Sequence, residues 1–224
     1  DAGGPVGRAA LYEEQGADEL VLLDVSATPE GRGHALATVR AVRRVLAIPL
    51  TVGGGVRSAE DAGALLEAGA DKVAVNTAAV ERPELLAEIA GRFGAQCAVL
   101  ALDAARRPPE GWEVVVRSGR EHTGIDALLW ARTATRHGAG EILLTSFDRD
   151  GTRSGYDLEL IGAVSRAVRV PVIASGGADT PQHLLEALHA GADAVLAASI
   201  FHDGDITVAE VKRDLAAGGV EVRP

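Results

Sequence analysis

The stretch from Pro171 to Ser199, PVIASGGADTPQHLLEALHAGADAVLAAS, decides the fold. The chain contains an earlier version of it from Pro49 to Thr77, PLTVGGGVRSAEDAGALLEAGADKVAVNT. The two copies lie 122 residues apart (171 − 49), and proline, the glycine pair and the Gly-Ala-Asp triplet keep that offset without a gap. Uninterrupted self-similarity of this length indicates a duplicated supersecondary unit.

Composition narrows the class of protein. The chain has 224 residues, 47% of them hydrophobic, and a formal net charge of −10. No Lys/Arg-rich run is present, which argues against nucleic acid or an anionic membrane surface as a partner. We expect no membrane span and no signal peptide, because no apolar run approaches roughly 18 residues. The single cysteine, Cys97, cannot form an internal disulfide and is expected to be a buried strand residue, so the predicted location is cytoplasmic.

Apolar runs alternate with segments of helical periodicity along most of the chain. We expect strands at 19–24, 49–52, 72–76, 96–103, 141–146, 171–175 and 194–198, and helices at 5–15, 34–45, after Ser58, 83–93, 126–136, 158–168, 181–190 and 207–217. The segment 104–123 breaks this rhythm and is expected to insert a hairpin or loop containing a small strand at 112–116. Strict alternation with apolar strands predicts an α/β protein with a parallel sheet, either open or closed as a barrel.

The repeat favours the barrel. The second half supplies four strands and the first half three, and the missing counterpart of the strand at 96–103 would fall before Asp1. We therefore predict a (βα)8 TIM barrel made of two similar half-barrels, about 1–95 and 96–224, that lacks its first β-strand and the following loop. The whole chain, 1–224, would form one domain, and its length agrees with the deficit because a complete barrel needs about 250 residues.

Active sites of such barrels lie at the carboxyl ends of the strands. Glycines there let an anion approach backbone N–H groups, and two copies at matching places predict two phosphate sites on opposite sides of the barrel mouth. The alternative is that each glycine pair only permits a tight turn. The residues that close the strands are Asp24, Gly55, Asn76, Thr77, Asp103, Thr145, Ser146, Ser175, Gly176, Gly177, Ala198 and Ser199.

Ionisable residues mark both ends of the predicted sheet. Asp103 closes a strand and is a candidate general acid or base. Asp148 and Asp150 lie in a loop that is either catalytic or a turn. At the amino ends, Glu19, Lys72 and Glu141 begin otherwise apolar strands and are expected to pair as a buried ion cluster. The six histidines show no metal-ligand spacing, so we predict no metal and no cofactor.

Several motifs together carry a resemblance to a known family, the cyclase subunit of imidazole glycerol phosphate synthase. The resemblance covers essentially the whole chain. Its motifs are Gly16-Ala17-Asp18-Glu19-Leu20-Val21, Thr51-Val52-Gly53-Gly54-Gly55, Asp71-Lys72-Val73, Asn76-Thr77-Ala78-Ala79-Val80, Gly138-Ala139-Gly140-Glu141-Ile142-Leu143, Asp148-Arg149-Asp150-Gly151-Thr152, Gly155-Tyr156-Asp157, Ile173-Ala174-Ser175-Gly176-Gly177 and Leu196-Ala197-Ala198-Ser199-Ile200-Phe201-His202.

The resemblance implies a lyase of histidine biosynthesis. Such an enzyme converts a phosphoribulosyl-formimino aminoimidazole carboxamide ribotide and ammonia to imidazole glycerol phosphate and aminoimidazole carboxamide ribotide. It also implies a glutaminase (glutamine amidotransferase) partner at the barrel floor, forming a heterodimer that passes ammonia through the barrel.

The same resemblance assigns roles to residues. Asp103 would be one of two catalytic aspartates. Gly55, Asn76 and Thr77 would hold one substrate phosphate, and the other would be held by Asp150, Gly151, Gly177, Ala198 and Ser199. Glu19, Lys72 and Glu141 would belong to the ammonia entrance, and Asp71 would lie near the glutaminase.

The chain departs from the family at its start. The other catalytic aspartate belongs to the first strand, and a lysine-bearing loop follows that strand; neither has a match here. We expect the 224-residue chain alone to be nearly inactive and poorly folded. Two alternatives stay open: the sister phosphoribosylformimino isomerase of the same pathway, and a non-catalytic phosphate-binding barrel.

Overall fold

The computed structural model describes residues 4–23 and 31–223, so the candidate site residue Asp24 lies outside the described part. The main sheet has seven parallel strands in the order β1-β2-β3-β4-β7-β8-β9. Each run expected to form a strand does so. The bounds are β1 Leu20–Leu23, β2 Leu50–Gly53, β3 Lys72–Val75, β4 Ala98–Arg106, β7 Glu141–Ser146, β8 Val172–Ser175 and β9 Ala194–Val195.

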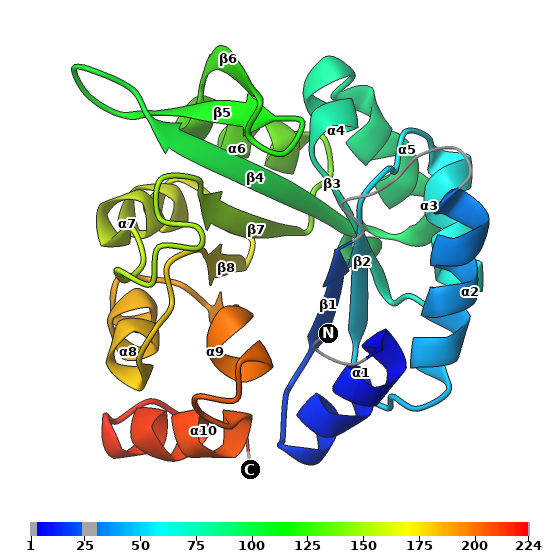
Figure 1. Cartoon of the computed structure of the whole chain (residues 1–224). Helices are drawn as coiled ribbons and strands as arrows, with labels where there is room; N and C mark the ends of the chain where they lie inside the picture. The colour runs from blue at the N-terminus through cyan, green and yellow to red at the C-terminus, as the bar shows by residue number, and fades with distance from the viewer. Residues whose placement is uncertain (1–3, 24–30, 224) are drawn as a thin grey trace.

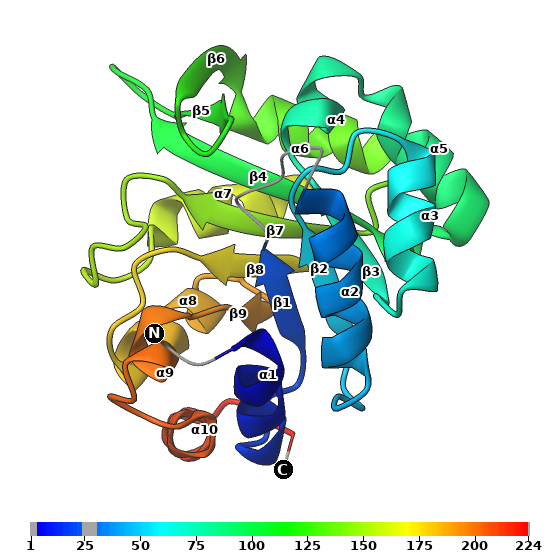
Figure 2. The same cartoon turned by 45° about the vertical axis from the view of Figure 1, so that its right-hand side comes forward.

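Helices connect these strands and cover the outer side of the curled sheet (Figures 1 and 2). Proline is the first residue of α1 and of α8. Side-chain oxygens of Ser58, Thr180 and Thr207 cap α3, α8 and α10, respectively. The helices are α1 Pro5–Glu14, α2 Gly31–Arg43, α3 Ala59–Glu67, α5 Glu84–Phe93, α6 Ala127–Arg136, α7 Leu158–Ala167, α8 Pro181–His189 and α10 Val208–Ala217. Within the described residues, no helix is long and apolar enough to cross a membrane.

The sequence repeat appears again in the backbone. Helices α1 and α6 begin and end at matching positions, 122 residues apart. Asp71 accepts a hydrogen bond from Leu50 N (2.8 Å), and Asp193 accepts the equivalent bond from Val172 N (2.9 Å). Glycines with positive φ occur in the same pairs, namely Gly16 and Gly138, Gly54 and Gly176, Gly55 and Gly177, and Gly69 and Gly191.

The segment after β4 forms the expected insertion. Strand β4 does not stop at Asp103 but continues to Arg106, because its last residues pair antiparallel with β5, Trp112–Val116. A further strand, β6 Glu121–Asp126, completes a hairpin that projects from one end of the sheet (Figure 1). The sequence predicted β5 but not β6, whose side chains are mostly polar.

Two local expectations were wrong. Cys97 is not a buried strand residue: it lies in the 3₁₀ turn η1, Ala95–Cys97, and is partly exposed. Helix α2 begins at Gly31, before the expected start at residue 34. In addition, the sequence did not predict two short helices. One residue separates helix α4, Thr77–Glu81, from β3, and three residues separate α9, Ser199–His202, from β9.

The core lies between the sheet and its helices. Leu100, Leu102, Ile142 and Leu144 on the two central strands are essentially inaccessible to solvent. A second, smaller cluster formed by Ala74, Val99 and Leu143 is separate from the first cluster. Side chains on alternate positions of β4 and β7 therefore fill both faces of the sheet, as buried parallel strands require. This packing fixes the strand ends on which the candidate site is built.

Candidate active site at the carboxyl ends of the strands

Asp103 lies among polar side chains from the two neighbouring strands. Its Oδ2 accepts a hydrogen bond of 2.8 Å from Asn76 Nδ2, at the end of β3. On the other side, Thr145 of β7 stands opposite Asp103 in the strand register and also hydrogen-bonds to its side chain. Three adjacent strands thus hold one carboxyl group in place.

Burial raises the pKa of Asp103 from 3.8 to about 6, and the negative charge of Asp150 contributes in the same direction. The hydrogen bonds from Asn76 and Thr145 oppose this rise because they favour the carboxylate. A carboxyl group with a pKa near 6 can both accept and release a proton close to neutral pH. The arrangement is therefore suited to proton transfer.

The first predicted phosphate site gathers at the end of β3. Asn76 has an unusual backbone conformation (φ −114°, ψ −93°) that turns the chain directly into α4, whose first residue is Thr77. Thr77 Oγ1 accepts a hydrogen bond of 3.1 Å from Arg117 N in the turn of the hairpin. Gly55, after β2, has φ 68°.

The second predicted site gathers after β7, β8 and β9. Gly176 and Gly177 follow β8 with φ 93° and 100°, and a Cβ on Gly177 would lie 2.3 Å from Gly155 O. Ser175 stands opposite Thr145 in the register of β7 and β8. The remaining residues lie in the same loops: Asp150 and Gly151 follow β7, and Ala198 and Ser199 lead into α9. The backbone conformation of Ala198 (φ −123°, ψ −64°) resembles that of Asn76.

Asp148 does not join this group. Its Oδ2 accepts a hydrogen bond of 2.7 Å from Arg106 N, so it ties the loop after β7 to the start of the hairpin. This contact gives Asp148 a structural role in the loop. The partnership of Asn76 and Asp103 was not expected from the sequence, where the two residues lie 27 positions apart.

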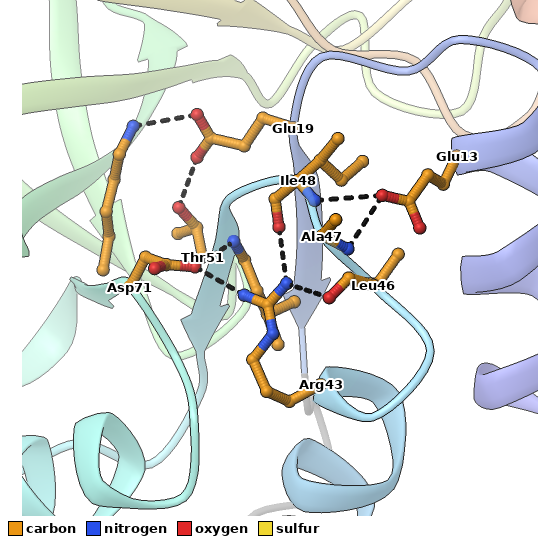
Figure 3. A network of polar contacts seen from close by, with 10 residues as sticks. Glu13, Glu19, Arg43, Leu46, Ala47, Ile48, Thr51 and Asp71 are labelled. Atoms are coloured by element: carbon orange, nitrogen blue, oxygen red, sulfur yellow. Dashed lines mark hydrogen bonds and ion pairs between the residues drawn. The ribbon is translucent and has the colours of Figure 1, made fainter.

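At the amino ends of the strands, Glu19, Lys72 and Glu141 form the expected ion cluster. Lys72 Nζ lies 2.8 Å from Glu19 Oε2 and 2.7 Å from Glu141 Oε2. Thr51 donates a further hydrogen bond to Glu19 (Figure 3). Burial alone would lower the pKa of Lys72, but its hydrogen bonds to Glu141 and Glu19 outweigh burial, and the pKa is raised. The lysine therefore stays charged.

Asp71 lies outside this cluster and is half-exposed. It pairs with Arg43 at 2.8 Å, and Arg43 also donates to the carbonyl oxygens of Leu46 and Ile48 (Figure 3). This network fixes the connection between α2 and β2 on the face where the strands begin. Among residues 4–23 and 31–223, no cluster of three or more side chains is arranged to hold a metal ion.

A curled parallel sheet, helices on its outer side and a polar site at the carboxyl ends of its strands define an α/β protein whose fold is consistent with a TIM barrel. The family model described as "Histidine biosynthesis protein" matches residues 1–207, and the chain therefore belongs to this family. It is also similar to a protein of Corynebacterium diphtheriae named imidazole glycerol phosphate synthase subunit HisF. The two are 57% identical over 229 aligned residues, which cover 100% of this chain and 89% of the relative.

Proposed function

We propose that this chain is the cyclase subunit of an imidazole glycerol phosphate synthase, a lyase of histidine biosynthesis. The observation that carries the proposal is the match over the full chain to a subunit of that enzyme, at 57% identity. In this proposal the chain combines a phosphoribulosyl-formimino aminoimidazole carboxamide ribotide with ammonia and releases imidazole glycerol phosphate and aminoimidazole carboxamide ribotide.

Asp103 is the proposed proton-transfer group. Its burial and its pKa of about 6 support this role, because ring closure and bond cleavage both require protons to move near neutral pH. Asn76 donates to the carboxylate and fixes the direction in which its free oxygen points. No cofactor is needed for these steps.

The substrate carries two phosphates, and the two strand-end groups are the proposed sites for them. Gly55, Asn76 and Thr77 would bind one phosphate. Positive-φ glycines and the neighbouring strand ends support the second group as the other site, since such backbone leaves N–H groups open to an anion. This group comprises Thr145, Asp150, Gly151, Ser175, Gly176, Gly177, Ala198 and Ser199.

A glutaminase partner is proposed for the opposite face. There the cluster of Glu19, Lys72 and Glu141 would be the entrance for ammonia, and the half-exposed Asp71 would contact the partner. We also propose a cytoplasmic location, on the grounds of the single cysteine and of a partner that works on a soluble metabolite.

We further propose that the chain forms one domain of two similar half-barrels, about 1–95 and 96–224, and that the complete barrel has one more strand between β9 and β1. The seven-strand order, in which neither β1 nor β9 has a second neighbour among the described strands, supports this arrangement. That strand would supply a second aspartate facing Asp103, and residues 1–224 alone would then have little activity.

The test is a pair of assays on the protein as the cell makes it and on residues 1–224. One assay supplies the phosphoribulosyl-formimino intermediate with ammonium, and the other supplies the aminoaldose substrate of the sister isomerase. We expect imidazole glycerol phosphate to form in the first assay, and to form only with ammonium. Isomerisation alone, or binding without conversion in either assay, would overturn the proposal.

A further inference from the structure

Arg153 makes contacts that the proposed reaction does not require. It lies in the loop between β7 and α7 and has φ 56°, a left-handed conformation that a residue with a side chain seldom adopts. Its guanidinium reaches three carboxylates: Nη1 lies 2.8 Å from Asp205 Oδ2 and 3.5 Å from Asp179 Oδ1, and Nη2 pairs with Asp203 Oδ2.

The three carboxylates come from different loops. Asp179 follows the glycine pair after β8, Asp203 ends α9, and Asp205 lies in the connection from α9 to α10. One planar side chain therefore joins the loops after β7, β8 and β9. These are the loops that carry Asp150–Gly151, Gly176–Gly177 and Ala198–Ser199.

Backbone contacts bring two of these loops into direct contact. Gly155 N donates a hydrogen bond of 2.8 Å to Gly177 O. Gly176 approaches the loop after β7 closely as well, since a Cβ there would lie 2.8 Å from Ser146 O. The glycine pair thus takes its position from the loop that Arg153 fastens.

The negative charges of the three carboxylates explain why a cation lies between them. Arg153 and its three partners together carry a net charge of −2, and without the arginine three carboxylates would face one another. A single exposed ion pair contributes little to stability. When one arginine pairs with three carboxylates, however, the conformational entropy of its side chain is lost only once for three ion pairs. The three negative charges would otherwise repel each other and any phosphate bound beside them.

We propose that Arg153 is a positioning residue that holds the loops after β7, β8 and β9 in the arrangement that receives one phosphate of the substrate. The proposal rests on the proposed function for the identity of the substrate, but not for its test. Arg153 acts through the loops and does not itself contact the reacting atoms.

The test measures binding of inorganic phosphate through the amide resonances of Gly177 and Ser199. Arg153→Met should weaken binding about tenfold, since affinity falls with the fraction of molecules that keep the binding arrangement. Arg153→Lys should give an intermediate loss, because one ammonium cannot meet three carboxylates. Arg213→Met is the matched control: it removes the same charge from an exposed site on α10 and should leave affinity unchanged.

Hydrogen exchange gives the second readout. In Arg153→Met, amides in 147–157, 176–180 and 198–206 should exchange faster together. If Arg153→Met does not fold, Asp203→Asn removes the charge of the closest acceptor and should cause a smaller loss in the same direction.

A purely structural role would lower the melting temperature while the folded protein kept its phosphate affinity, and that result would overturn the proposal. So would equal affinities for Arg153→Met and Arg213→Met. A protein that binds phosphate at Ser199 with the expected dependence on Arg153, but forms no imidazole glycerol phosphate, would retain this inference and refute only the proposed function.

Discussion

Asp103 occupies a position that opposes its own ionisation. Its side chain is largely buried, and Asn76 and Thr145 on the neighbouring strands donate hydrogen bonds to the carboxylate. The folded-state pKa of about 6 lies above the ordinary value of 3.8, so the folded protein disfavours the charged form. This group therefore lowers stability above about pH 6, and the loss disappears as the pH falls towards 4.

Replacing Asp103 by Asn tests both roles of the carboxyl group. Turnover should fall at least about 100-fold, because the amide cannot transfer the proton. Substrate affinity should stay nearly intact, because asparagine has the same size and shape as aspartate. The free energy of unfolding at pH 7 should rise by up to about 3 kcal/mol, and the gain should shrink at pH 4. Urea denaturation at the two pH values measures it, with the exposed Glu60→Gln as control.

The same carboxyl group should set the pH dependence of the reaction. Before substitution, kcat/KM should change through an ionisation near pH 6, since the pKa of Asp103 is raised to about 6. The residual activity of Asp103→Asn should lack that ionisation. An unchanged pH profile in the variant would assign the ionisation to another group.

The ion cluster of Glu19, Lys72 and Glu141 depends on the positive charge of its lysine. The three side chains are 14–25% exposed, and Lys72→Met would leave the two carboxylates facing each other without a cation. We expect a loss of about 1–3 kcal/mol in the free energy of unfolding. Arg82→Met, which breaks the exposed pair with Glu88, should destabilise the protein clearly less than Lys72→Met does. Equal losses for the two variants would mean that the cluster is solvated.

Elements differ in how far their sequence determines them. Apolar runs located the seven parallel strands, and the capping residue Ser58 placed the start of α3. Helices α4 and α9 could not be predicted, because each has one turn or little more and begins within a few residues of a strand end without a side-chain cap. Their backbone is set by the strand that precedes them.

The turn after β8 should be the least tolerant of side chains. Gly177→Ala would place a Cβ 2.3 Å from Gly155 O at a residue with φ 100°. Gly16→Ala is the matched control, because Gly16 has φ 89° with nothing within 4 Å of the added atom. The control should cost about 1 kcal/mol from backbone strain alone, and Gly177→Ala at least twice as much. Thermal unfolding of both variants separates the clash from the strain.

At the scale of the whole molecule, the alternation of apolar runs with helical segments predicted a parallel sheet and its two ends, and the repeat favoured a barrel. Neither pattern predicted which side chains meet, because periodicity assigns a residue to a face and leaves the register between strands open. The contact of Asn76 with Asp103 and the three carboxylates around Arg153 depend on that register and on loop conformations. The sequence therefore indicates the strand ends that carry the candidate site, but not the contacts between its side chains.

The repeat also provides a matched pair of hydrogen bonds for testing where the sheet is weakest. Leu20 N donates to Pro49 O, and Ile142 N donates to Pro171 O, both at 2.9 Å and 122 positions apart. Leu20 lies on β1, which pairs with one strand in the described part of the chain. Ile142 is inaccessible to solvent and lies on β7, which has a neighbouring strand on both sides.

Edge strands open by local fluctuations, while central strands exchange only when the whole domain unfolds. We therefore expect the amide of Leu20 to exchange at least about 100-fold faster than that of Ile142, whose protection should equal the free energy of global unfolding. Native-state hydrogen exchange measured by NMR, with urea denaturation as the reference, checks both values. Because the two bonds have the same length and occupy matching positions of the repeat, equal protection would mean that the sheet is held as firmly at β1 as at its centre.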